Sequence, residues 1–109
     1  MPLTIADLME KMPGALIPEK AAGVDAVIHF KFTGPEAGEW NAVIKDGRAD
    51  VARGIPHSKP TMTLTADSSD FINILTGELD GMQAFMQGKI KLAGDLNLAM
   101  KMMQMFKVR

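Results

Sequence analysis

The sequence predicts an α+β domain, with a five-stranded, mostly antiparallel sheet and helices covering one face. Four segments, at about 24–32, 40–45, 48–53 and 61–66, alternate apolar and polar side chains with a period of two. This alternation is typical of an antiparallel sheet with one solvent-facing side and one covered side. A fifth alternating segment, 89–93, follows two short segments with helical spacing. Helices and sheet are therefore expected to share one core in a single domain, residues 1–109.

The composition excludes several classes of function. The chain has 109 residues and no cysteine, which rules out thiol nucleophiles, thiolate metal sites and a disulfide framework. Its 12 basic and 13 acidic residues give a net charge of −1 without a run of either sign, so neither nucleic acid nor an anionic membrane is expected as a partner. Ten methionines accompany only five phenylalanines and one tryptophan, which favours flexible apolar surface over rigid packing.

The N-terminal segment lacks the features of a targeting signal. No basic region precedes an apolar run, and Asp7, Glu10 and Lys11 interrupt the apolar residues. No apolar run approaches the ~18 residues of a membrane-spanning helix. The expectation is a soluble, cytoplasmic protein with no stable membrane insertion.

The first predicted element is a short helix at about 4–12. Thr4 followed three residues later by Asp7 is a loose version of the capping box, and Pro13-Gly14 is expected to end the helix. Residues 15–22 are expected to form a connection with one helical turn after Pro18.

Each predicted strand has a defined inward face. Asp46-Gly47 is expected to join the second and third strands as a tight hairpin, because both central positions of such a turn favour positive φ. The segment 54–60, with two prolines and a glycine, is expected to be a surface loop. The inward residues are Ala26, Ile28, Phe30, Phe32, Trp40, Ala42, Ile44, Ala49, Val51, Met62, Leu64 and Ala66.

Two helices are expected to follow the fourth strand and to cover the sheet. Asp67 or Ser68 can cap the first, which runs to about residue 76, and the second is expected at about 80–87. Gly77 and Gly88 are expected to end them. Their apolar residues are Phe71, Ile72, Ile74, Leu75, Met82, Phe85 and Met86.

The end of the chain carries a strand that turns directly into a helix. Gly94-Asp95 forms the corner, and Asp95 is expected to cap the helix at 96–106, which we call the C-terminal helix. At about 100° per residue its apolar side chains form a continuous arc of roughly 220°. A helix that lies on a core needs an arc of only a little over ~100°. Roughly half of this apolar arc is therefore expected to contact something other than the core of the domain.

The candidates for catalytic residues are few. They are His29, His57, Ser58, Asp67, Asp70 and Asp95. His29 alternates with polar residues and is expected to be a solvated surface side chain, His57 and Ser58 are read as loop residues, and the aspartates are read as helix caps. No metal-ligand spacing, dinucleotide fingerprint or phosphate loop is present in the sequence. We expect no enzyme activity, no cofactor and no metal.

Three interpretations remain for the methionine and aromatic residues of the C-terminal half. They can fill the core over the sheet, they can line an apolar cavity for a small molecule, or the surplus apolar arc can pack against a partner subunit.

A family resemblance favours the cavity. Phe71 and Gly77, then residues 84–100 with the run Gly88-Lys89-Ile90 and the corner Gly94-Asp95, closely resemble the C-terminal half of the sterol carrier protein type-two family. Phe30-Lys31-Phe32-Thr33-Gly34, Trp40 on the second strand and the Asp46-Gly47 turn also resemble that family. The similarity covers nearly the whole chain. It implies a five-stranded sheet with helices over one face, a hydrophobic tunnel between them, and binding of fatty acid, fatty acyl-CoA or sterol without catalytic chemistry.

The sequence therefore predicts a lipid-binding protein. The wall residues we expect are Trp40, Phe71, Leu75, Phe85, Met86, Leu98, Met102, Met105 and Phe106. A lipid head group could meet Lys101 or Lys107, which are otherwise read as solvated lysines. The alternative is an interaction module that forms a homodimer or binds another protein through the C-terminal helix. The ending Lys107-Val108-Arg109 does not match the peroxisomal tripeptide of some family members.

Overall fold

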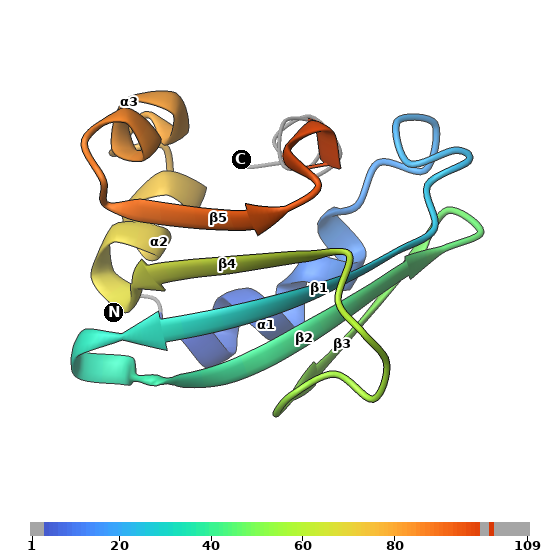
Figure 1. Ribbon diagram of the computed structural model, residues 1–109, viewed down its shortest axis with the longest axis horizontal. Helices are drawn as coiled ribbons and strands as arrows, with labels where there is room; N and C mark the ends of the chain where they lie inside the picture. The colour runs from blue at the N-terminus through green and yellow to red at the C-terminus, as the bar shows by residue number, and fades with distance from the viewer. Residues whose placement is uncertain (1–3, 99–100, 102–109) are drawn as a thin grey trace.

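The computed structural model describes residues 4–98 and 101, and these form an α+β domain (Figure 1). Its five-stranded sheet has the order β3-β2-β1-β4-β5. The strands are β1 (Ala26–Thr33), β2 (Gly38–Lys45), β3 (Arg48–Arg53), β4 (Met62–Asp67) and β5 (Ile90–Gly94). The helices are α1 (Ile5–Ala15), the 3-10 turn η1 (Gly34–Glu36), α2 (Ser68–Leu75) and α3 (Gly81–Met86). The predicted fold class and five strands are confirmed.

Three of the strand pairings are antiparallel, and one is parallel. β1 pairs with β2, β2 with β3 and β4 with β5 in antiparallel register, whereas β1 and β4 run parallel at the centre of the sheet. The predicted inward faces are confirmed, because Ile28, Phe30, Ala42, Ile44 and Met62 are at most 1% exposed. Asp46 (φ 55°) and Gly47 (φ 72°) form the expected hairpin turn between β2 and β3.

Helix α1 begins as predicted and ends later than predicted. Thr4 Oγ1 accepts from the Asp7 amide and Asp7 Oδ2 accepts from the Thr4 amide, each at 3.1 Å, which completes the capping box. The hydrogen bond that Thr4 donates holds the pKa of Asp7 below its ordinary value. Pro13 does not end the helix: it lies inside the last turn, and the helix continues to Ala15. So close to the end, proline removes a single helical hydrogen bond, and the break moves to the extended C-cap Leu16.

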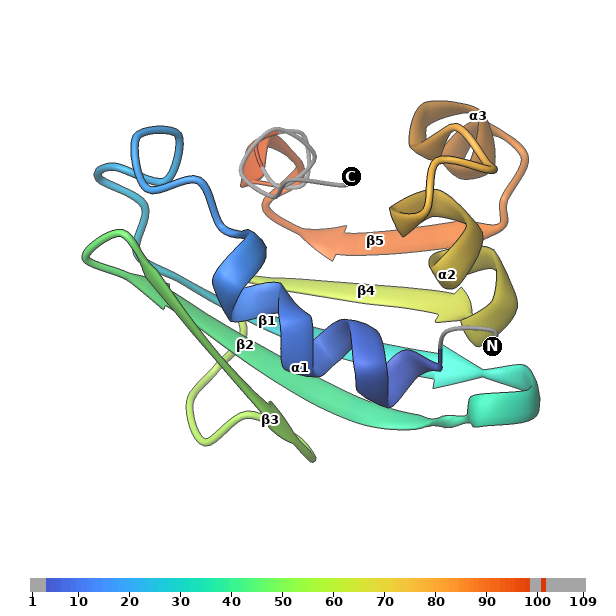
Figure 2. The same ribbon diagram turned by 180° about the vertical axis from the view of Figure 1, so that it is seen from behind.

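Both longer helices lie over the same face of the sheet (Figure 2). Helix α1 crosses the half of the sheet formed by β1, β2 and β3. Helix α2 lies against the end of β1 that carries Phe30 and Phe32. The turn η1 joins them: Glu36 Oε1 accepts from the Ile5 amide at 2.9 Å, and Ser68 Oγ accepts from the Glu36 amide at 3.1 Å. Asp67 caps α2 through the Ser69 amide at 2.8 Å. The start of α1 and the start of α2 are thus fixed relative to one another by η1.

The strand that ends the sheet turns sharply into the C-terminal helix. Gly94 has φ 99°, and Asp95 Oδ1 accepts from the amides of Asn97 (3.0 Å) and Leu98 (3.2 Å), so the predicted corner and cap are confirmed. Residues 96–98 and 101 are helical, and the rest of the predicted helix lies outside the described residues. Within the described part of the chain, no helix is long and apolar enough to cross a membrane.

Candidate functional site

The half of the inner sheet face under α1 is a closed core. Met9, Ile44 and Ala42 are fully buried, Ile5 is 2% exposed and Met12 is 5% exposed. Side chains so tightly surrounded leave no room for a ligand, since protein interiors pack nearly as densely as organic crystals. A binding site on this face must therefore lie toward β4 and β5.

Aromatic side chains fill one end of that second half. The Phe71 ring lies 4.9 Å from the ring of Phe32 and 5.8 Å from the ring of Phe30, measured between centroids, and the latter contact is edge-to-face. Phe30 and Phe32 stack on each other at 5.9 Å. These separations are typical of favourable aromatic pairs. Phe71 thus packs α2 onto the end of β1 that carries Phe30 and Phe32.

Three of the apolar residues that follow Phe71 are incompletely buried. Leu75 on α2, Leu79 in the loop after it and Leu92 on the inner face of β5 are only half-buried, although all three pack against the core. Leu98, at the start of the C-terminal helix, is 5% exposed. The inner face of β4 is buried, and the incompletely covered part of the core is its edge at Leu75, Leu79 and Leu92.

The nine residues predicted to line a cavity fall into four groups in the structure. Trp40, Phe71 and Leu98 are buried, and Leu75 is half-buried. Phe85 and Met86 are exposed, at 41% and 80%. Met102, Met105 and Phe106 lie outside the described residues. Trp40 is paired with Arg53 of β3, and the guanidinium carbon of Arg53 is 4.5 Å from the centre of its ring.

Helix α3 presents a different face from the one expected. Ala84 is fully buried, whereas Met82 is 47% exposed and Phe85 and Met86 also point outward. The helix has only six residues, with Asp80 capping the amides of Met82 and Gln83. Such a short helix reaches the core through one small side chain, so the prediction that its large apolar residues cover the sheet was wrong.

A polar depression of about 200 Å³ lies where the chain enters β1 beside the C-terminal helix. It is lined by residues 22–26, Thr61, Asp95, Asn97, Leu98 and Lys101. The depression combines two buried apolar residues, Ala26 and Leu98, with two carboxylates and one ammonium group at its rim. Only Leu98 and Lys101 were recognised from the sequence as possible ligand contacts.

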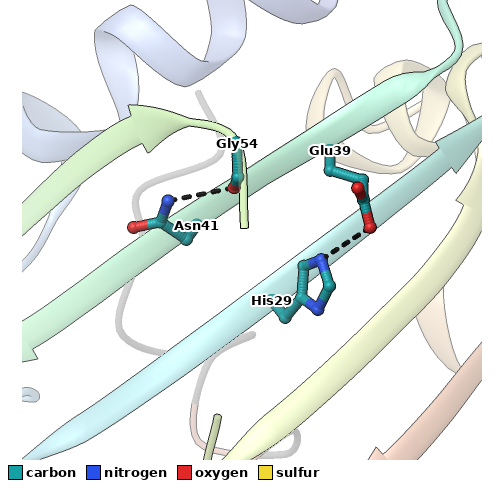
Figure 3. Close-up of polar contacts among 4 residues, drawn as sticks. All are labelled: His29, Glu39, Asn41 and Gly54. Carbon is teal, nitrogen blue, oxygen red and sulfur yellow. Dashed lines mark hydrogen bonds and ion pairs between the residues drawn. The ribbon is translucent and has the colours of Figure 1, made fainter. Parts of the chain in front are cut away.

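The outer face of the sheet is not entirely open to solvent. Residues 54–61 cross this face between β3 and β4 (Figure 1), and the residues His29 and Asn41 are each 8% exposed. His29 Nε2 lies 3.0 Å from Glu39 Oε1, and Asn41 Nδ2 donates to the Gly54 carbonyl at 3.0 Å (Figure 3). The prediction of a solvated His29 was therefore wrong. The signal that could have found this was Glu39, which the strand alternation places on the same face.

The other polar residues considered as catalytic candidates lie in a surface loop or cap helices, as the sequence predicted. His57 and Ser58 are exposed in the loop, and Asp67 and Asp95 cap helices as predicted. Among the described residues, no group of three His, Asp or Glu side chains could hold a metal ion. The site chemistry available on the inner face is thus burial of apolar surface, with a polar depression at one end.

Comparison with known proteins agrees with these features. The model of the SCP-2 sterol transfer family matches residues 6–107. Hydroxysteroid dehydrogenase-like protein 2 of Xenopus tropicalis is 36% identical over 89 residues, 81% of this chain and 21% of its own length. Peroxisomal multifunctional enzyme A of Dictyostelium discoideum is 34% identical over 89 residues, 82% of this chain and 20% of its own length. The chain thus spans about a fifth of these curated relatives.

Solved structures show the same fold. Sterol carrier protein 2 like 2 of Aedes aegypti has a TM-score of 0.72 and 27% identity, and the match covers 92% of this chain and 90% of the other. A solution structure of the palmitated form of that protein has a TM-score of 0.73 and 26% identity, with 94% of this chain covered and 93% of the other. A sec-alkylsulfatase from Pseudomonas has a TM-score of 0.84, covers 96% of this chain with 16% of its own, and is 21% identical, which shows the fold alone.

Proposed function

The chain belongs to the SCP-2 sterol transfer family, and on that premise we propose that it binds an apolar lipid between α2, β5 and the C-terminal helix and transfers it without catalysing a reaction. The observation that carries this proposal is the uneven burial of the inner face. Under α1 the core is closed, whereas Leu75, Leu79 and Leu92 are left half-buried. Half-buried apolar side chains that face inward are the surface that a lipid chain would cover.

The energetics need no directional contact. Burial of a methylene group contributes about 0.8 kcal/mol. A long acyl or isoprenoid chain could therefore reach the ~8 kcal/mol of micromolar binding, even after the cost of immobilising it. A site of this kind requires apolar walls and access, which explains why the sequence carries no catalytic motif.

The relatives support the ligand class at a general level. The Aedes aegypti protein has been solved with palmitate, so a structure of this fold accommodates an acyl chain. The dehydrogenase-like relatives are about five times longer than the match, and their activities belong to those proteins. For this chain we propose the lipid-binding role alone.

We assign different roles to the predicted wall residues. Phe71 would close one end, and Leu75 and Leu98 would lie along the lipid, joined by Leu92, which the sequence analysis had not included. We retain Met102, Met105 and Phe106 as the proposed wall from the C-terminal helix. Phe85 and Met86, because they are exposed, would contact a lipid only at an entrance, and Trp40 would contribute to the core.

The test is uptake of a long-chain hydrocarbon carrying a pyrene label, whose fluorescence reports an apolar environment. Leu92→Gln should weaken uptake about tenfold, because a buried amide without a partner costs about 1–3 kcal/mol. Ile55→Gln is the matched control: Ile55 is 64% exposed in the loop on the other face, so this variant should take up the probe normally. Circular dichroism would verify that both variants are folded.

Two results would contradict the proposal. Normal uptake by a folded Leu92→Gln variant would show that the ligand does not lie against β5. The second test is native mass spectrometry of gently purified protein, followed by organic extraction of any bound lipid. A monomer that releases a lipid supports a carrier, and a ligand-free homodimer would favour the interaction module.

A further inference from the structure

The polar depression beside the C-terminal helix borders on the apolar core. Ala26 and Leu98 line it, and these side chains are only 3% and 5% exposed. Both belong to the same cluster of buried residues as Phe71 and Met62. A lipid lying along Leu98 would therefore reach solvent at this depression. Its volume of about 200 Å³ would hold a head group and a few waters, whose share of liquid volume is about 30 Å³ each, but not a whole lipid.

The charges around the depression do not suit an anion. The described residues of its lining include two carboxylates, Asp25 and Asp95, and one ammonium group, Lys101. The N-terminus of the C-terminal helix could otherwise bind an anion through its free amides. Here Asp95 Oδ1 already accepts from the amides of Asn97 and Leu98. Among the residues that the structure describes around the depression, a lipid carboxylate would find one positive partner, Lys101, and would be repelled by Asp25.

The same groups suit a hydroxyl. A hydroxyl both donates and accepts hydrogen bonds, whereas a carboxylate only accepts them. A lipid alcohol could donate to the carboxylate of Asp25 or to the second oxygen of Asp95. It could accept from the side-chain amide of Asn97 or from Lys101. The hydroxyl of Thr61, whose oxygen accepts from the Val27 amide at 3.1 Å, keeps its own proton for a further hydrogen bond.

We infer that this depression is the head-group subsite of the protein and that it selects lipids with an uncharged hydroxyl over free fatty acids and acyl-CoA. The inference rests on the proposed function, since it locates the polar end of the lipid that the apolar interior would hold. Acyl-CoA is disfavoured for the same reason as the fatty acid, because its phosphate groups add further negative charge beside Asp25.

The experiment compares two lipids of equal chain length, hexadecanol and palmitic acid, as competitors of the pyrene-labelled hydrocarbon. It is run at low salt and at a pH where the acid is ionised. The wild-type protein should bind the alcohol more tightly than the acid. Asp25→Lys replaces a negative by a positive charge, and at roughly 8 Å in water-like dielectric this should strengthen palmitate binding about fivefold. Hexadecanol binding should change less and in the opposite direction, because the uncharged alcohol loses Asp25 as one acceptor and keeps the carboxylate of Asp95.

The control is Asp50→Lys, which makes the same change of charge on β3, at the opposite edge of the sheet from β5. It should leave both affinities unchanged. Asp25 and Asp50 are both exposed, so neither substitution disturbs the core. If wild-type protein binds palmitate as well as hexadecanol, or if Asp25→Lys has no effect on palmitate, the head-group inference is wrong while lipid binding stands. If neither lipid displaces the probe, the proposed function itself fails.

Discussion

Replacing Gly94 by alanine should destabilise the protein and misplace the C-terminal helix. Gly94 has φ 99°, a conformation that residues with a side chain rarely adopt, and a Cβ atom there would lie 2.5 Å from the carbonyl oxygen of Thr61. That oxygen also accepts from the amide of Asp95 at 3.1 Å, so the added methyl would press on the hydrogen bond that fixes the corner. The substitution combines backbone strain with a collision against backbone atoms.

The two costs can be separated by a second glycine. Backbone strain of this kind costs about 1–3 kcal/mol, and a weakened hydrogen bond adds about 0.5–1.5 kcal/mol. Gly23 also has positive φ (77°), but a Cβ atom there would meet nothing within 4 Å. Gly23→Ala should therefore lower the free energy of unfolding through backbone strain alone. Gly94→Ala should lower it by about 1–2 kcal/mol more, because it also loses the hydrogen bond and makes the close contact.

Urea unfolding followed by circular dichroism measures both variants, and the difference should appear as a lower midpoint at an unchanged slope. The pyrene uptake assay gives the functional readout. Gly94→Ala should bind the probe more weakly than Gly23→Ala, because the corner sets the direction in which the C-terminal helix, part of the proposed wall, leaves β5. Equal stability and equal uptake of the two variants would refute the reasoning that close approach to Thr61 sets the corner.

Two further predictions concern the helix starts. Ser68→Ala should lower the free energy of unfolding by about 1–2 kcal/mol in urea, because the part-buried amide of Glu36 loses its acceptor; stability equal to wild type would show that water replaces the hydroxyl. Asp7 has a lowered pKa, chiefly because the backbone amide of the capping threonine donates to its carboxylate. Its stabilisation is therefore present above the ordinary value of 3.8 and is lost as the pH falls through the lower folded value. In the Asp7→Asn variant, the free energy of unfolding should fall less steeply as the pH is lowered through the acidic range. The same pH dependence as in wild type would contradict this.

Most of the fold follows from local patterns. The alternation of Ile28, Phe30 and their neighbours specifies which face is buried, and Thr4 with Asp7 specifies where α1 begins. The parallel pairing of β1 and β4 could not be predicted, because the period of two is the same in parallel and antiparallel strands. The end of α1 was misjudged because Pro13 is tolerated in a last turn.

The candidate site was less predictable than the fold. Phe71 could be identified from its position after a helix cap, but the outward orientation of Phe85 and Met86 depends on how closely Ala84 approaches the sheet. On the outer face, the buried side chain of Asn41 donates to the carbonyl of Gly54, which lies beyond the end of β3, and the buried His29 lies beside Glu39 of the next strand. Sequence periodicity assigns a side chain to a face, and it does not show what covers that face.

The parallel pair at the centre of the sheet has a consequence for how the chain folds. β1 meets β2 across a short connection, but its other neighbour begins much later: Val27 and Thr61, which exchange hydrogen bonds beside the start of β4, are 34 residues apart. Such non-local pairing raises contact order and slows folding, since loop closure precedes the stabilising contact. On the ribosome, a nascent chain that ends before β4 would present the apolar edge of β1 unpaired, and this edge is where premature aggregation would begin.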